Sequence, residues 1–526
     1  MSPAPQRALL VGLSLVVAVL AGCTVGPSQR PPVAVRGETV PPPPSVTATA
    51  PAQPSEELPV PEAQHATIPF ADCTADTLTA LGIGAPATGA LRIECGEISV
   101  PTDPDQPGLG RSRLGVVQAG AADAPATRPP LLVVGDTGTD PSARHAARLA
   151  TQVSPEVLAR YRLVGLDRRG SGVDALDCAP PVARAALIDA DRGAGTDDGL
   201  TALLEQARGI VQSCYLLLAG EIGSYRTAST AADIEELRGA LGVRRLSAIG
   251  VGDGAAALAG WANAHPEAVG RLVLDGPLDP ALDQPELSQA RAGAAEETFD
   301  AFATTCTATG TCPLGPDPRG AVTTLVERLR AQPLATADGR RLTAGITVNA
   351  LLAALSEPRG WPQLATALGQ AVHGDPDALL AMFEPVAGSQ GRFDAELATS
   401  CNDAHRRLTP PEVGQLAARW SAEYPLFGGT FALRLLACAP WPAAPAGPAT
   451  GPAAEAPPIL VLGTAHDPRA PLAGAKRAAD SLRTARFAGW QGSGTGAYPR
   501  TPCISGIVDR MLVDGMVPQT GTVCPP

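Results

Sequence analysis

The sequence predicts an α/β fold: a mostly parallel sheet with helices on both faces and an inserted, mostly helical cap. Three observations support this class. From about residue 66, short apolar runs alternate with helix-like segments, a pattern typical of a parallel sheet covered on both sides. Residues 281–449 then break the alternation, since they are Ala-rich and helical in pattern. A strand pattern resumes after them, so the helical block interrupts the sheet late in the chain.

The individual elements follow from apolar runs, which predict strands, and from end signals, which predict helices. Residues 229–242 are expected to form a helix, because Ser and Thr start the segment, Asp and Glu follow, and Gly ends it. Residues 484–494 are expected to form the last strand. The expected strands are 91–101, 112–120, 129–136, 161–172, 246–250, 270–280, 457–471 and 484–494.

The inserted block would cover the carboxyl edge of the sheet, which is where open α/β sheets bind ligands. The alternative is an independent helical domain. No internal repeat is found. The chain is expected to divide into the segments 1–22 (signal), 23–65 (tether), 66–280 (first part of the α/β core), 281–449 (helical cap) and 450–526 (last part of the core).

The first 22 residues have the features of an export signal. Arg7 precedes the apolar run Ala8–Leu20, which is short for a membrane span, and the sequence LAGC ends at Cys23. Small residues before a cysteine favour cleavage at Cys23 with a lipid on its thiol, as in bacterial lipoproteins. The alternative is an ordinary secretory signal. Residues 23–65 are Pro-rich and predict an extended tether. We expect an extracytoplasmic protein that contacts the outer face of the cell membrane only through its lipid anchor.

Ten of the eleven cysteines remain after Cys23, and an even number in an exported chain indicates disulfides. The connectivity is not fixed by sequence. The simplest pairing joins neighbours: Cys73–Cys95, Cys178–Cys214, Cys306–Cys312, Cys401–Cys438 and Cys503–Cys524. None of these cysteines has C-x-x-C spacing, so a zinc site is not expected. No cofactor is expected either. The net charge of −12, with no basic cluster, argues against nucleic-acid binding.

The stretch AIGVGDGAAALAG, residues 248–260, raises the question of function. A short apolar run stops at a tight glycine turn, and a helix of small residues follows. This is the layout of the nucleophile elbow G-x-S-x-G of hydrolases. Here the sequence is Gly250-Val251-Gly252-Asp253-Gly254, so glycine stands at the position of the serine.

Several further segments carry a family resemblance when taken together. They are YRLVGLDRRGSGVDALDC (161–178), TASTAADIEELRGALG (227–242), HPEAVGRLVLDGPLDP (265–280), CAPWP (438–442), ILVLGTAHDPRAP (459–471) and GMVPQTGTVCPP (515–526). With them the chain resembles the secreted tripeptidyl aminopeptidases of actinomycetes, a peptidase S33-like family of α/β hydrolases with a cap domain. The resemblance covers about residues 70–300 and 400–526.

The resemblance implies Ser-His-Asp acyl transfer, in the chain order Ser, Asp, His. It places the nucleophile at Gly252, which has no side chain. It places the acid at Asp467, which is retained, and the histidine at Thr495, in QGSGTGAYP. No histidine follows His466 in the chain. Two of the three triad residues are therefore expected to be replaced.

The oxyanion donors are expected to be the backbone N–H of Asp253 and a loop that reads G-G-P-G in the family. This loop corresponds to Gly135-Asp136-Thr137-Gly138. Negative charge on Asp136, Asp140 and Asp253 would oppose a developing oxyanion. The loop therefore departs from the family pattern together with the triad.

We expect a degenerate, non-catalytic hydrolase fold whose cleft binds a peptide, an acyl ligand or a partner protein, in a monomer. A second hypothesis is an active peptidase or esterase in which Asp253 replaces the serine as nucleophile. A third is a structural role in the cell envelope with no ligand in the cleft.

Overall fold

The computed structural model describes residues 68–83, 91–108, 110–123, 128–218, 221–387, 392–442, 451–519 and 521–526. These residues belong to one compact unit, Ala63–Pro526. The expected signal (1–22), tether (23–65) and lipidated Cys23 lie outside the described residues.

A ten-stranded sheet forms the first layer of the described part of the chain, in the order β1-β2-β3-β5-β4-β6-β7-β10-β11-β12. The strands from β5 to β12 in this order run parallel, and β1, β2 and β3 are antiparallel to their neighbours. The strands are β1 (Ala71–Asp72), β2 (Leu91–Pro101), β3 (Arg111–Ala121), β4 (Pro130–Val134), β5 (Arg162–Leu166), β6 (Leu246–Val251), β7 (Val269–Asp275), β10 (Ile459–His466), β11 (Ala485–Ser493) and β12 (Thr522–Cys524).

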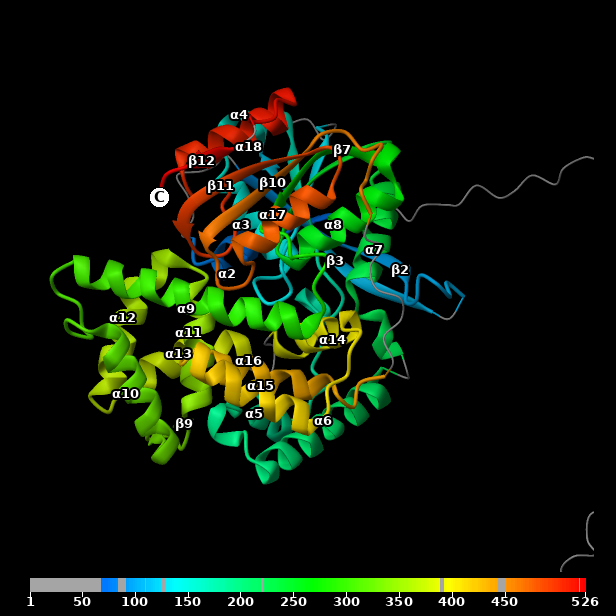
Figure 1. The fold of residues 1–526 in the computed structure, drawn as a ribbon. Coiled ribbons are helices and arrows are strands. Elements are labelled where there is room, and N and C mark those ends of the chain that lie inside the picture. The colour runs from blue at the N-terminus through cyan, green and yellow to red at the C-terminus, as the bar shows by residue number, and fades with distance from the viewer. Residues whose placement is uncertain are drawn as a thin grey trace, which may run out of the picture. The chain divides into compact units, whose positions relative to one another are not determined.

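Helices cover both faces of this sheet, as the alternating sequence pattern predicts (Figure 1). One face packs against α2 (Thr74–Ala80), α3 (Ser142–Ala150), α4 (Pro155–Arg160) and α18 (Pro502–Asp514). The other packs against α7 (Thr227–Ala240), α8 (Asp253–Ala264) and α17 (Leu472–Ser481). The central strands β4 and β6 are buried and apolar except for the half-buried Ser247, because both of their faces are covered. This is the α/β-hydrolase fold that the resemblance implies.

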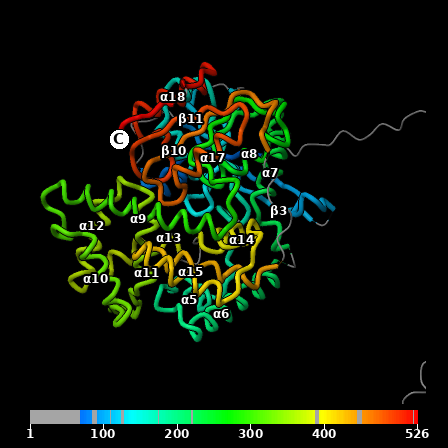
Figure 2. The backbone as a smooth tube through the Cα atoms, viewed as in Figure 1, coloured from blue at the N-terminus to red at the C-terminus, as the bar shows by residue number. Residues whose placement is uncertain are grey.

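A second, helical body lies beside the carboxyl edge of the sheet, and Figure 2 shows its tube separate from that of the strands. It contains α9 (Gln284–Ala308), α10 (Pro318–Ala331), α11 (Ala344–Leu355), α12 (Trp361–Val372), α13 (Asp377–Ala387), α14 (Phe393–Asp403), α15 (Pro410–Glu423) and α16 (Gly428–Arg434), and a small hairpin of β8 (Leu334–Ala335) and β9 (Arg341–Leu342). We call this body the cap.

The cap has its own apolar core, and two helices from earlier in the chain also pack into that core. Residues of α5 (Pro181–Asp189) and α6 (Asp197–Leu217) are buried in the same apolar cluster as α9 to α16. The expected boundary, which gave residues 66–280 to the α/β core, therefore leaves α5 and α6 out of the helical body. An amphipathic helix pattern shows that a helix has a buried face but not which body covers that face.

The chain also has a strand after β11, so the expectation that 484–494 forms the last strand is wrong. Thr522–Cys524 pairs with Ala488–Trp490 as β12 at the sheet edge. The described residues contain five disulfides, and they are the neighbouring pairs that the sequence predicts: Cys73–Cys95, Cys178–Cys214, Cys306–Cys312, Cys401–Cys438 and Cys503–Cys524. The last of them ties β12 to the start of α18.

Candidate active-site cleft

Gly252 forms the sharp turn between β6 and α8. Its backbone has φ 58° and ψ −123°, a conformation that residues other than glycine rarely adopt. The glycines on either side allow close packing: a Cβ at Gly250 would lie 2.7 Å from the Cα of Ala255, and a Cβ at Gly254 would lie 2.5 Å from the carbonyl oxygen of Val134. The turn therefore has the backbone form expected of a nucleophile elbow.

The space above Gly252 is filled by Asp136, from the loop after β4. A Cβ built at Gly252 would lie 2.2 Å from Oδ2 of Asp136, and that carboxylate is only 1% exposed. Its Oδ2 accepts the backbone N–H of Asp253 at 3.2 Å, and its Oδ1 accepts the N–H of Gly138 at 3.0 Å. An aspartate carboxylate thus occupies the N-terminus of α8, where helix geometry favours an anion.

Asp253 makes the reciprocal contact with the loop. Its Oδ1 accepts the backbone N–H of Thr137 at 2.9 Å, and its Oδ2 accepts the hydroxyl of the same residue. The guanidinium of Arg168 forms an ion pair with this carboxylate. Burial and the neighbouring charge of Asp136 raise the pKa of Asp253. The N–H groups of Thr137 and Asp253 therefore each donate to the carboxylate of an aspartate in the opposite segment.

Arg469 compensates the charge of Asp136. Its Nε lies 2.9 Å and its Nη2 2.7 Å from Oδ1 of Asp136, and Nη2 also lies 2.8 Å from Oε1 of Glu396 on α14. Burial alone would raise the pKa of Asp136, but the charges of Arg469, Arg291 and Arg168 and the N–H of Asp253 together outweigh burial, and the pKa is lowered. The chain of contacts Asp136–Arg469–Glu396 joins the expected oxyanion loop to the cap.

Asp467, the expected acid, follows β10 at the same edge of the sheet and is 1% exposed. Its Oδ1 accepts the N–H groups of Arg469 at 2.9 Å and of Ala470 at 3.0 Å. Its Oδ2 has no hydrogen-bond partner among the described residues. Burial raises the pKa of Asp467 to about 6, although the bonds to Oδ1 act in the opposite direction.

Thr495 lies in direct contact with this carboxylate. Its hydroxyl donates to Oδ1 of Asp467 at 2.9 Å, and its backbone N–H donates to the carbonyl of Ser356 in the cap at 2.9 Å. The next residue adjoins the elbow, because a Cβ at Gly496 would lie 3.5 Å from Cγ1 of Val251. Gly252, Asp467 and Thr495 are therefore brought together at one edge of the sheet.

The histidines occupy other positions in the described part of the chain, and none donates to Asp467. His466 precedes the acid on β10, and its Nδ1 is buried with no hydrogen-bond partner among the described residues. His145 lines the cleft from α3, where burial lowers its pKa to about 4. His265 ends α8, three turns from Gly252. His405 lines the cleft from the cap.

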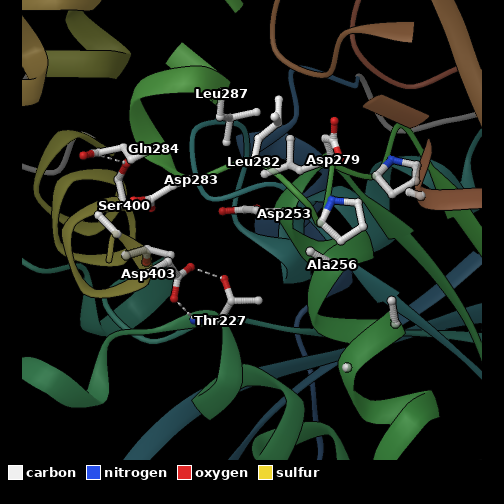
Figure 3. A pocket seen from close by; sticks show the side chains of 18 of the residues that line it. Thr227, Asp253, Ala256, Asp279, Leu282, Asp283, Gln284, Leu287, Ser400 and Asp403 are labelled. Carbon is white, nitrogen blue, oxygen red and sulfur yellow. Dashed lines mark hydrogen bonds between the residues drawn. The ribbon is translucent and has the colours of Figure 1, made fainter. Parts of the chain in front are cut away.

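Three adjoining cavities lie between the sheet edge and the cap, with volumes of about 280, 120 and 290 Å³. All three are lined by Arg469 and Glu396. The first is acidic, and Figure 3 shows the side chains of Asp253, Asp283 and Asp403 around it. The Asp136–Arg469–Glu396 contacts therefore cross an otherwise open cleft.

Sequence reasoning assigned no role to Arg469 or Glu396, and it did not foresee that Asp136 lies over Gly252. The sequence did contain one signal. Asp136 and Asp253 were both expected at the elbow, and two buried carboxylates need a nearby cation. Arg469, two residues after the expected acid Asp467, was available for that role. Across the described ranges, no group of three or more His, Cys, Asp or Glu side chains is arranged to hold a metal. No helix of the described segments has both the length and the apolar character needed to cross a membrane.

Comparison with known proteins finds one matching family model, several relatives of similar length and a solved hydrolase. Residues 424–524 match a family model described as TAP-like protein. The chain is 28% identical over 464 residues to the serine protease Hip1 of Mycobacterium tuberculosis (83% of this chain, 87% of that protein). It is 28% identical to carboxylesterase B of the same organism (82% and 86%) and 26% identical to the tripeptidyl aminopeptidase of Streptomyces lividans (82% and 84%). A solved hydrolase from Pseudomonas aeruginosa PA01 covers 77% of this chain and 95% of its own, with 15% identity and a TM-score of 0.32.

Proposed function

We propose that this protein, an α/β-hydrolase fold with a TAP-like C-terminal domain, is an exported and lipid-anchored pseudohydrolase that binds a peptide or acyl ligand in the cleft without cleaving it. One observation carries the proposal. The carboxylate of Asp136 fills the space that a side chain at position 252 would need, and it holds the N–H of Asp253. A negative charge there opposes the oxyanion of acyl transfer.

Further observations support the proposal. Asp467 retains the place and burial of a triad acid, but its side-chain partner is the hydroxyl of Thr495, which has no nitrogen that can carry a proton between groups. The relatives named above as a serine protease, a carboxylesterase and a tripeptidyl aminopeptidase point to peptide-like or acyl ligands. Five disulfides fit an oxidising compartment outside the cytoplasm, and the lipid anchor rests on the sequence at Cys23.

The contacts of Asp253 disfavour the alternative in which it acts as a nucleophile. Its oxygens are held by Thr137 and by Arg168, and a carboxylate nucleophile also needs an activated water to release the product. Among the described residues, no histidine forms a hydrogen bond or an ion pair with Asp253, although His405 lines the same cavity. A covalent adduct on Asp253 after incubation with an ester, found by mass spectrometry, would favour the alternative.

The test is hydrolysis of tripeptide anilides and short nitrophenyl esters by the purified protein. Loss of serine or histidine from such a triad costs up to about 10⁶ in turnover, so we expect no rate above that of the heat-denatured sample. Thermal unfolding in the presence of tripeptides then reports binding. Turnover at enzyme-like rates that is lost in Asp467→Ala would refute the proposal.

A further inference from the structure

Two arginines of the cap face the second cavity without an acidic partner. Arg291 lies on α9, and its Nε donates to the backbone carbonyl of Arg469 at 2.7 Å. Arg434 ends α16, donates to the side-chain oxygen of Asn349 and lies 5.9 Å from the ring centre of Phe431. Neither guanidinium forms an ion pair with any carboxylate in the described part of the chain.

The charge balance of this cavity is positive. Arg291, Arg434 and Arg469 line it together with one carboxylate, Glu396, which Arg469 already binds. Burial lowers the pKa of Arg291 and of Arg434 and the charge of Arg469 lowers both further, although the nearby charge of Glu396 acts in the opposite direction on both. A cation away from water is costly unless it is paired. An anion between the two guanidinium groups would remove that cost.

The remaining wall of the cavity is apolar. The apolar lining residues are Leu187, Ile188, Leu352, Phe383 and Phe431 from α5, α11, α13 and α16, and Leu435 directly after α16. Gln284, Ser288, Asn349 and Ser400 add polar groups to the same wall. The volume of about 120 Å³ is below the roughly 300–1,000 Å³ of pockets that take a drug-sized ligand. The cavity therefore suits the end of a ligand, not a whole one. It continues into the first cavity, because Gln284, Arg291 and Ser400 line both.

We propose that Arg291 and Arg434 bind the carboxylate of a ligand whose apolar end group fills the second cavity. The ligand chemistry is a carboxylate next to a short hydrocarbon group, which both the C-terminal residue of a short peptide and a short fatty acid provide. Guanidinium groups suit this ligand, since they bind carboxylates through two parallel hydrogen bonds. The inference rests on the proposed function, because it assumes a cleft that retains its ligand uncleaved.

The test is titration calorimetry of the purified protein with four probes: N-acetyl-Ala-Ala-Leu, its C-terminal amide, hexanoate and hexanamide. We expect at least one of the two acids to bind at least about tenfold more tightly than its amide, because the amide lacks the charge that the arginines bind. Binding of the peptide acid alone identifies a peptide ligand. Binding of hexanoate alone identifies a fatty acid, and binding of both supports the carboxylate site.

Variants locate the site. Arg434→Met is expected to weaken acid binding at least about tenfold, whereas Arg434→Lys, which keeps the charge, loses less. Arg406→Met is the control, because Arg406 is an exposed cap arginine, 54% accessible and paired with Glu286. It should bind the acids as the unchanged protein does. If Arg434→Met does not fold, the inference is tested by the ratio of acid to amide affinity in the unchanged protein and by the affinity of Arg434→Lys for the acids.

Equal affinity for acid and amide, or acid binding weaker than about 1 mM, overturns the inference. So does an Arg406→Met variant that loses as much affinity as Arg434→Met. These outcomes differ from failure of the proposed function, which is shown by hydrolysis of esters or anilides. A protein that binds peptide acid and amide alike without cleaving them would keep the proposed function and lose this carboxylate site.

Discussion

The acid end and the elbow end of the cleft differ in how their polar groups are satisfied. At the acid end, Oδ1 of Asp467 holds Thr495 and two backbone N–H groups, while Oδ2 has no partner among the described residues. At the elbow end, both oxygens of Asp136 are bound, and Asp253 is bound in turn. At the acid end, Oδ2 of Asp467 is an acceptor without a donor among the described residues. At the elbow end, the carboxylates of Asp136 and Asp253 occupy the backbone N–H donors.

Under the proposed function, the two ends therefore differ from a complete triad in different ways. A smaller side chain at position 495 leaves the acid in place with one oxygen unused. At position 252, glycine leaves room that Asp136 fills, and Arg469 balances the charge of Asp136. Restoring chemistry would therefore require removal of Asp136 as well as addition of the missing side chains.

The largest expected effect is on catalysis. We predict that the triple variant Gly252→Ser/Asp136→Gly/Thr495→His hydrolyses nitrophenyl esters at least about 10³-fold faster than the unchanged protein, because complete triads contribute up to about 10⁶. The double variant Gly252→Ser/Thr495→His should stay silent, because its serine Cβ would lie 2.2 Å from Asp136. Initial rates with matched protein concentrations measure both.

Equal activity of the double and triple variants would show that Asp136 moves aside easily. In that case the proposed lack of hydrolysis would follow from the missing serine and histidine side chains alone and not from the closure of the elbow. A crystal structure of the double variant would then show where the carboxylate goes.

The next largest effect is on stability at the elbow. We predict that Gly252→Ala lowers the free energy of unfolding by about 3–5 kcal/mol, because it combines a positive φ with a clash against Asp136. Urea unfolding at constant pH measures it. A double-mutant cycle with Asp136→Gly separates the two causes. In the Asp136→Gly background, Gly252→Ala should cost less, because only the backbone strain remains; the difference between the two costs is the coupling free energy due to the clash. Zero coupling would mean that the carboxylate of Asp136 does not clash with a side chain at position 252.

The sequence predicts most of the sheet because buried parallel strands are continuous apolar runs with clear ends. Leu91–Pro101 and the helix Thr227–Ala240 lie within two residues of the expected bounds. Thr522–Cys524 was missed because three residues are too short for any periodicity. The place of α5 and α6 in the cap was missed because it depends on tertiary packing.

The same contrast holds for the site. Gly252, Asp467 and Thr495 could be expected at one edge, since each follows a strand of a parallel sheet. The closure could not be predicted, because the contact from Arg469 to Asp136 joins residues 333 positions apart. Local sequence patterns predict where strands end. The direction of a buried side chain such as Asp136 depends on all the elements packed around it.

A smaller effect concerns the acid end and depends on pH. Burial raises the pKa of Asp467 from 3.8 to about 6, so the folded state disfavours its ionised form. Stability from this group is complete below about pH 4 and is lost as pH rises through 6. Relative to Asp467→Asn, the unchanged protein should lose about 2–3 kcal/mol between pH 3.5 and pH 7.

Urea unfolding of both proteins across this pH range measures the difference. Asp167 also has a pKa raised by burial to about 6, but it is present in both proteins and cancels. A constant difference between the two proteins across the range would contradict the prediction and would place the pKa of Asp467 near its ordinary value.

The smallest effect is the loss of the hydroxyl at position 495. Thr495→Val keeps the shape of the side chain but removes the donor to Oδ1 of Asp467, and it should cost about 1–2 kcal/mol at pH 7. The cost should shrink at pH 4, because a bond to a neutral carboxyl is weaker than a bond to a carboxylate. Thr495→Ser, which keeps the donor, is the control. If Val and Ser cost the same at pH 7, the hydroxyl of Thr495 does not stabilise the carboxylate of Asp467, and the side chain at position 495 contributes only by packing.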